Sequence, residues 1–154
     1  MTIVQQLTPY TCGLACIESI CADFGRDGRQ EKLLRDFKNE LLAGARKYEE
    51  FGSTSPQMEC HFLTQLGFTL ERCVRDHRPE VQQETFEKID LATQAILISA
   101  NFHLQSRHCV RFAGMKDTTD TMLVMEPSLI NQSKIAEYSI ADLIKWDYSF
   151  CIFS

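Results

Sequence analysis

A cysteine close to the start of the chain lies where an amphipathic helix is expected to begin. Cys12 follows a turn-prone segment at Thr8-Pro9. The apolar residues after it recur at the spacing of a core-facing helix: Leu14, Ile17, Cys21 and Phe24. The first N–H groups of a helix lack partners within the helix, and the positive end of the helix dipole favours a thiolate. Cys12 is therefore a candidate nucleophile.

A histidine and a carboxylate occur later, at the open end of an expected β-hairpin. Residues 106–114 have the pattern of a strand that begins with His108, and residues 122–126 have the pattern of a strand that ends at Glu126. The polar segment 116–120 between them favours a turn. An imidazole can take the thiol proton and later give it to a leaving group, and a neighbouring carboxylate can orient the imidazole. The sequence thus predicts a Cys-His-acid site.

Gln6 precedes Cys12 by six residues and can supply a further catalytic group. Its side-chain amide, beside the backbone N–H of Cys12, would give two donors to the oxyanion that forms on a carbonyl under attack, each worth about 3 kcal/mol of barrier. Gln5 is adjacent and remains an alternative for this role.

Several other residues have a structural interpretation that competes with a catalytic one. His61, His77 and His103 are expected to be solvated side chains, and Asp117 and Asp120 to be turn residues. Asp117 and Asp120 are the next candidates for orienting His108 if Glu126 does not. Cys16, one helical turn beyond Cys12, is expected in the core, although oxidation could join the two.

The composition limits the classes of protein to which the chain can belong. The 154 residues fit one domain, residues 1–154, and the net charge of -5 without a run of Lys or Arg argues against nucleic acid as a partner. Seven cysteines without paired spacing argue against a disulfide framework or a zinc site, and we expect reduced thiols, no metal and no cofactor. We find no leader and no run long enough to span a membrane.

The hydrophobic pattern predicts helices first and a sheet afterwards, which is the order of an α+β fold. After the Cys12 helix, the expected elements are one long helix 30–50, a helix from Pro56 that stops at Gly67, a strand 68–74, a loop 76–83, a helix 84–91, strands 95–100, 108–114 and 122–126, a helix 140–146 and a strand 150–153.

These motifs together resemble the double-glycine, or bacteriocin-processing, group of the papain-like cysteine peptidases. The resemblance rests on Gln6, the Cys12-Gly-Leu-Ala-Cys16 helix start, His108 before an apolar strand, and an apolar strand closing on Glu126-Pro127; residues 52–56 and 66–68 resemble the middle segment of the family. It implies a papain-like minimal domain with N-terminal helices packed on a C-terminal antiparallel sheet. It also implies that Gln6 lines the oxyanion hole, Cys12 is the nucleophile, His108 the base and acid, and Glu126 the orienting residue. The family usually has Asp before that Pro, so the extra methylene of Glu126 must be absorbed by a backbone shift or another rotamer.

The sequence hypothesis is a peptidase that cleaves an amide bond in a peptide or protein through a thioester. In the family that the sequence resembles, the substrates are leader peptides that end in two small residues. The peptidase domains of that family are commonly fused to a transporter. The possible partners of this chain are therefore a separate transporter, a host target or an immunity protein. The alternatives are a glutamine deamidase or acyl transferase of the toxin and effector type, and a non-catalytic binding module with this fold. The expected location is the cytoplasm, or a target cell reached by a non-classical secretion route.

Overall fold

The computed structural model describes residues 1–75, 78–101, 107–117, 120–128 and 134–154. Within this part of the chain the helices and strands are, in order, α1 (Cys12–Asp23), α2 (Gln30–Asp36), α3 (Lys38–Gly44), the 3₁₀ turn η1 (Tyr48–Glu50), α4 (Pro56–Gln65), β1 (Leu70–Val74), α5 (Pro79–Glu87), β2 (Ala95–Ala100), β3 (His108–Met115), β4 (Thr121–Glu126), β5 (Lys134–Ser139), α6 (Ile140–Lys145) and β6 (Ser149–Phe153). The predicted α+β class is confirmed.

The described strands form a six-stranded antiparallel sheet in the order β1-β6-β2-β3-β4-β5. The predicted hairpin is present, because β3 pairs with β4 in the register Arg111↔Met125 and Phe112↔Val124. This pairing brings the start of β3 and the end of β4 to one end of the sheet, which is where the hairpin placed His108 and Glu126.

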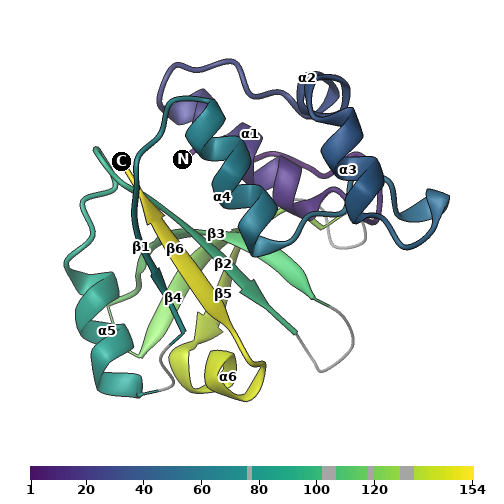
Figure 1. Ribbon diagram of the computed structural model, residues 1–154. Coiled ribbons are helices and arrows are strands. Elements are labelled where there is room, and N and C mark those ends of the chain that lie inside the picture. The colour runs from purple at the N-terminus through teal and green to yellow at the C-terminus, as the bar shows by residue number, and fades with distance from the viewer. Residues whose placement is uncertain (76–77, 102–106, 118–119, 129–133) are drawn as a thin grey trace.

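Helices cover both faces of the sheet, so the molecule has three layers (Figure 1). One core lies between α1–α4 and one sheet face, and includes Leu14, Phe62 and Leu97. The other lies between α5, α6 and the opposite face, and includes Phe86, Ile98 and Leu143. Successive residues of a strand point to opposite faces, which explains why every residue of the central strand β2 is buried.

The start and end of α4 follow from local residue chemistry. The Ser55 hydroxyl accepts a hydrogen bond from the Met58 N–H, and Pro56 occupies the first helical turn. At the other end, Gly67 has a φ of 90°, and the Phe68 N–H donates to the Leu63 carbonyl at 3.0 Å. The predicted start and stop of this helix are confirmed.

Three predicted boundaries are wrong. The long helix predicted at 30–50 is two short helices, α2 and α3, separated at Phe37, followed by η1. The Phe37 ring stacks on the Phe62 ring of α4 at a centroid distance of 4.1 Å, so a tertiary contact lies at the break. The predicted loop 76–83 and helix 84–91 are also displaced, because α5 already begins at Pro79 and ends at Glu87. The strand β5 was not predicted.

Candidate active site

The segment before α1 is held rigidly by buried polar side chains. The Thr11 hydroxyl accepts hydrogen bonds from the backbone N–H groups of Leu7 and Thr8, at 2.8 and 3.0 Å. Gln30 of α2, also buried, accepts from the Leu7 N–H and donates to the Gln5 carbonyl. The turn that delivers the chain to Cys12 is therefore tied both to itself and to α2.

Cys12 is the first residue of α1 and is partly exposed. Thr11 stands at the N-cap position but makes no side-chain capping bond, because its hydroxyl is engaged with the preceding turn. The N–H groups of the first helical turn therefore receive no side-chain cap from Thr11.

Gly13 lets a second segment approach the nucleophile closely. A Cβ at this position would collide with the Thr54 hydroxyl and lie 2.6 Å from Oε1 of Glu59. The loop before α4 and the first half of α4 therefore pack directly on the start of α1.

His108 and Glu126 meet at the end of the hairpin, as predicted. Nε2 of His108 lies 2.5 Å from Oε1 of Glu126, and both side chains are largely buried, with 22% and 8% of their surface exposed. Since Nε2 contacts Glu126, Nδ1 is the ring nitrogen that can face the Cys12 sulfur.

Two further groups fix the carboxylate of Glu126. The Tyr138 hydroxyl donates to Oε2 and the Ser128 N–H donates to Oε1, each at 3.1 Å. Burial and the neighbouring Glu126 charge raise the pKa of Tyr138 above its ordinary value, so Tyr138 remains a hydrogen-bond donor at neutral pH. Sequence reasoning missed Tyr138 because it stands on β5, the strand that was not predicted.

Cys12 lies close enough to His108 to influence the pKa of the ring. Burial by itself opposes the charged ring and lowers the pKa of His108. The hydrogen bonds and charges of Cys12 and Glu126 outweigh burial and raise the pKa to about 10. The arrangement therefore favours a protonated imidazole between a sulfur and a carboxylate.

A pocket of about 370 Å³ opens on this pair, between the helical layer and the sheet. Cys12 and His108 line it from opposite sides. Tyr10, Arg46 and Glu50 contribute from the helical side, and Ser99 and Arg107 from the sheet side. Gln6 and Glu126 lie outside the lining. The pocket can admit a polar extended chain next to the sulfur.

A buried carboxyl group that the sequence analysis did not consider also lines this pocket. Glu59 is 3% exposed and accepts a hydrogen bond from Thr54 at 2.9 Å. Burial raises the pKa of Glu59 to about 7, although hydrogen bonds from Thr54 and Cys109 and the charge of Arg107 favour the carboxylate. No spacing or motif in the sequence indicated this residue.

Gln6 is 6% exposed and folds over the turn before Cys12. Its Nε2 donates to the Thr8 carbonyl at 2.7 Å, which leaves one of its two amide protons for another acceptor, and its backbone N–H donates to the Pro127 carbonyl. Its Oε1 has no hydrogen-bond partner among the described residues. Gln5, in contrast, is exposed, which favours Gln6 for the role at the oxyanion.

The remaining candidates lie apart from the site or outside the described residues. His61 is exposed and its ring packs against Phe37, at 6.2 Å between centroids. Asp117 and Asp120 are exposed next to the hairpin turn. His77 and His103 fall on residues that the structure does not describe. Cys16 is a buried free thiol whose Sγ lies 3.5 Å from the Cys109 carbonyl, in the core as predicted.

A buried ion pair joins the helix of Cys12 to the strand of His108. Arg111 of β3 is 1% exposed, and its Nη1 donates to Asp23 and Ser19 of α1, each at 2.8 Å. Burial of such a group is tolerated when it is paired and hydrogen-bonded. The pair fixes α1 against β3, and so fixes the two elements that carry the sulfur and the imidazole.

One expectation about the cysteines is wrong. Cys73 and Cys151 form a disulfide, whereas the sequence analysis predicted reduced thiols throughout. The two are 78 residues apart in sequence, and the pairing of β1 with β6 places them opposite each other. Spacing along the chain carries no signal for such a contact.

No family model and no curated protein sequence matches the chain. Solved structures do. The peptidase domain of Streptococcus ComA, a bi-functional ABC transporter involved in a quorum-sensing pathway, matches with a TM-score of 0.70 at 13% identity, over 97% of this chain and 96% of that one. The peptidase domain of Streptococcus mutans ComA matches with a TM-score of 0.59 at 15% identity, over 99% and 98%. The Pseudomonas avirulence protein AvrPphB gives a TM-score of 0.46 at 13% identity over 94% and 90%, which is too low to bear on the fold.

These likenesses show that the chain has the fold of the ComA peptidase domains. The predicted papain-like architecture is confirmed. None of the helices in the described part of the chain is long and apolar enough to cross a bilayer.

Proposed function

We propose that the chain is a cysteine peptidase that cleaves an amide bond in a peptide or protein. One observation carries the proposal: His108, whose ring contacts the buried carboxylate of Glu126, lines the same pocket as Cys12. The fold of two solved peptidase domains supports it, since the chain covers nearly the whole of each.

The reaction follows from the proton positions. The thiol proton of Cys12 passes to Nδ1 of His108, and the sulfur attacks the carbonyl carbon of the substrate. The negative charge on the carbonyl oxygen is stabilised by the Cys12 backbone N–H and by the second amide proton of Gln6. His108 then protonates the departing amine, which leaves a thioester. A water molecule that gives its proton to His108 hydrolyses the thioester and frees the acid and the sulfur.

Glu126 would stabilise the charged ring throughout without taking the proton itself. Tyr138 and Ser128 would keep its carboxylate in place. The substrate would lie as an extended segment in the pocket between the helical layer and the sheet. By likeness to the peptidase domains of transporters, its source would be a peptide precursor handed over by a partner protein.

The nucleophile can be tested by alkylation. Burial raises the pKa of Cys16, Cys21 and Cys60 above the ordinary range, and Cys73 and Cys151 are bonded to each other. Iodoacetamide should therefore label Cys12 much faster than the other cysteines, and His108→Ala should slow this labelling strongly. His61→Ala, which removes an exposed imidazole, should leave it unchanged. Equal labelling of all free cysteines would contradict the proposal.

The reaction type can be read by intact-mass analysis of candidate substrates incubated with the protein and with Cys12→Ala. Cleavage that depends on Cys12 would support the peptidase. A gain of about one mass unit without cleavage would instead identify a glutamine deamidase, because the same thioester chemistry on a side-chain amide releases ammonia. No change with any substrate, together with slow labelling of Cys12, would indicate a binding module.

A further inference from the structure

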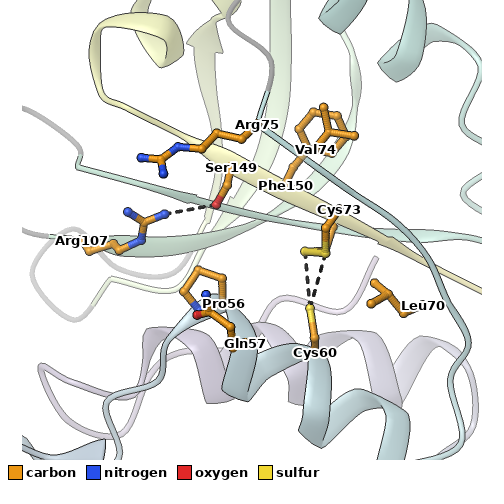
Figure 2. Close-up of a pocket in the computed structure, with 11 residues that line it drawn as sticks. Pro56, Gln57, Cys60, Leu70, Cys73, Val74, Arg75, Arg107, Ser149 and Phe150 are labelled. Atoms are coloured by element: carbon orange, nitrogen blue, oxygen red, sulfur yellow. Dashed lines mark hydrogen bonds between the residues drawn. A yellow bond between two sulfur atoms is a disulfide. The ribbon is translucent and has the colours of Figure 1, made fainter.

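Three cysteine sulfurs from three different elements converge where α4 lies against the sheet. Cys60 belongs to α4, Cys73 to β1 and Cys151 to β6. The Cys60 sulfur lies 3.7 Å from that of Cys73 and 3.4 Å from that of Cys151. Figure 2 shows the Cys60 sulfur pointing up from the helix at the Cys73–Cys151 pair. The three sulfur atoms all lie within 4.8 Å of one another.

Backbone pairing and helix packing bring these sulfurs together. Cys73 and Cys151 are register partners of the antiparallel pair β1–β6, with their Cα atoms 4.2 Å apart. Cys60 stands on the face of α4 that packs against the sheet, because Leu63, one turn further along that face, is fully buried. The cluster therefore joins the helical layer to the sheet.

The geometry does not favour thiol–disulfide exchange within the cluster. In such an exchange the attacking sulfur lies in line with the bond that breaks, so its distances to the two bonded sulfurs differ by one S–S bond, about 2 Å. The distances from Cys60 are 3.7 and 3.4 Å, which are nearly equal. Cys60 lies beside the Cys73–Cys151 bond, at the apex of a triangle.

A triangle of thiolates is the arrangement that a thiophilic metal ion needs. Zn²⁺ binds thiolates at about 2.3 Å in a tetrahedron, in which two sulfur ligands are about 3.8 Å apart. Both distances from Cys60 are close to this edge length. Reduction frees the sulfurs of Cys73 and Cys151 to separate to a similar distance. We propose that Cys60, Cys73 and Cys151, in the reduced protein, form a three-thiolate site for a thiophilic metal ion.

The fourth coordination position would be open. Among the described residues no imidazole or carboxylate joins the three sulfurs, and His61, next to Cys60 in sequence, packs its ring on Phe37 and Phe62. A pocket of about 700 Å³ borders the cluster and is lined by the three cysteines together with Pro56, Gln57 and Arg107. This space admits the ion and a water molecule or an anion as the fourth ligand.

Nearby cations suit a site with net negative charge. Three thiolates and one Zn²⁺ carry a charge of about -1. Arg75 and Arg107 both line the pocket; Arg107 is held by Ser99 and Ser149 at 3.0 and 3.1 Å, and Arg75 is paired with Asp147. Arg107 also lines the pocket of Cys12, so the two sites are neighbours.

The metal site forms in two steps, reduction of the disulfide and binding of the ion. A phosphine opens the Cys73–Cys151 bond, taking up the oxygen of one water molecule and leaving two thiols. Binding of Zn²⁺ then forms three metal–sulfur bonds and releases the three thiol protons to solvent. The oxidised protein, with one free thiol in the cluster, lacks the ligands and should not bind.

The experiment is a zinc titration of the reduced protein after anaerobic removal of the phosphine, against a chromophoric chelator. We expect one equivalent of Zn²⁺ per chain in the reduced protein and none in the oxidised one. Cobalt(II) in place of zinc should give thiolate-to-metal charge-transfer absorption. Cys60→Ser and Cys73→Ser should each weaken binding by at least about 10-fold; two variants on different elements guard against a folding defect in one of them.

Cys12→Ala is the matched control, because it removes the thiol of the other Cys–His pair and leaves the cluster intact. It should bind one Zn²⁺ with unchanged affinity. If the reduced protein takes up no zinc, or if Cys12→Ala loses binding while Cys60→Ser keeps it, the proposal is wrong. A trapped Cys60–Cys151 disulfide without zinc uptake would point instead to exchange among the three sulfurs and would also overturn it. The outcome is independent of whether the protein is a peptidase.

Discussion

Glu126 stands where the peptidase family that the sequence resembles usually has an aspartate. Its carboxylate accepts hydrogen bonds from His108, Ser128 and Tyr138. The longer side chain reaches the imidazole because three donors hold both of its carboxylate oxygens. Glu126→Asp should therefore lose activity, since a shortening of about 1.5 Å breaks a hydrogen bond that tolerates a few tenths of an ångström. Glu126→Gln should lower turnover strongly while preserving stability, because an amide does not stabilise the charged ring.

The measurement is kcat/KM on a substrate found by mass analysis, or the rate of Cys12 alkylation if none is found. Glu137→Gln, which changes an exposed carboxylate on β5, serves as the control and should behave as the parent protein. Full activity in both Glu126 variants would remove this residue from the mechanism. Asp117 and Asp120 would then be the next candidates for orienting His108.

The raised pKa of His108 predicts a pH dependence of stability. The folded value of about 10 lies above the ordinary value of 6.5. The charged ring therefore contributes its full stabilisation below about pH 6.5 and loses it as the pH rises through about 10. Each pKa unit corresponds to about 1.4 kcal/mol, so the loss is on the order of a few kcal/mol. Urea unfolding between pH 6 and pH 10.5 should show this loss, and His108→Gln should show a smaller one. Equal slopes in the two proteins would contradict the assigned pair.

At the scale of elements, the contact between α1 and β3 decides how well the sulfur and the imidazole are aligned. Arg111→Met removes the cation that joins the two and leaves Asp23 partly buried beside the N-terminus. We expect a loss of about 2 to 3 kcal/mol in the free energy of unfolding. We also expect Cys12 to be alkylated more slowly in Arg111→Met than in the parent protein. Both effects can be measured on the same preparation by urea unfolding and by timed labelling.

Lys116→Met is the comparison for this variant. Lys116 pairs with Glu137 between β3 and β5, but both side chains are about half exposed, at 46% and 54%. An exposed pair contributes less than about 1 kcal/mol. A loss from Arg111→Met no larger than that from Lys116→Met would show that the buried pair does not fix α1 on β3.

Elements with a strong apolar period were predictable from the sequence, and weakly patterned ones were not. The helix after Cys12 and the strands β2, β3 and β4 follow their patterns because both sheet faces are buried. The strand β5 lies at the sheet edge with most of its side chains at least partly exposed, so its sequence lacks an apolar run. Tyr138, which this strand carries, was missed for the same reason.

The interruption at Phe37 shows a different limit. Two short helices that keep one apolar face have the same period as a single long helix, so the pattern of residues 30–50 does not distinguish them. The contact of Phe37 with Phe62 joins α2–α3 to α4, and contacts of this kind are invisible to local periodicity. Capping signals did locate α4, because the Ser55 hydroxyl and the Gly67 backbone act on residues close to them in sequence.

For the whole molecule, the predicted site residues were selected by residue type and strand order, and the missed ones owe their positions to the fold. Cys12, His108 and Glu126 were predicted from residue type and strand order; His108 contacts Glu126 and lines the pocket that Cys12 also lines. Glu59 reaches the pocket by the packing of α4 on Gly13, and the cysteine cluster depends on β1 pairing with β6. Both contacts join segments that are distant in sequence.

The order of strands in the sheet has a consequence for how the protein is made. β6, residues 149–153, lies between β1 and β2 in the sheet, so both of these strands leave the ribosome before the neighbour that separates them. A growing chain therefore carries two strands with unpaired edges, together with an already complete α1. α1 and the strands β3 and β4, which carry Cys12, His108 and Glu126, are all translated before β6. The nascent protein therefore stays exposed to mispairing and to chaperones until β6 has been translated and fills the place between β1 and β2.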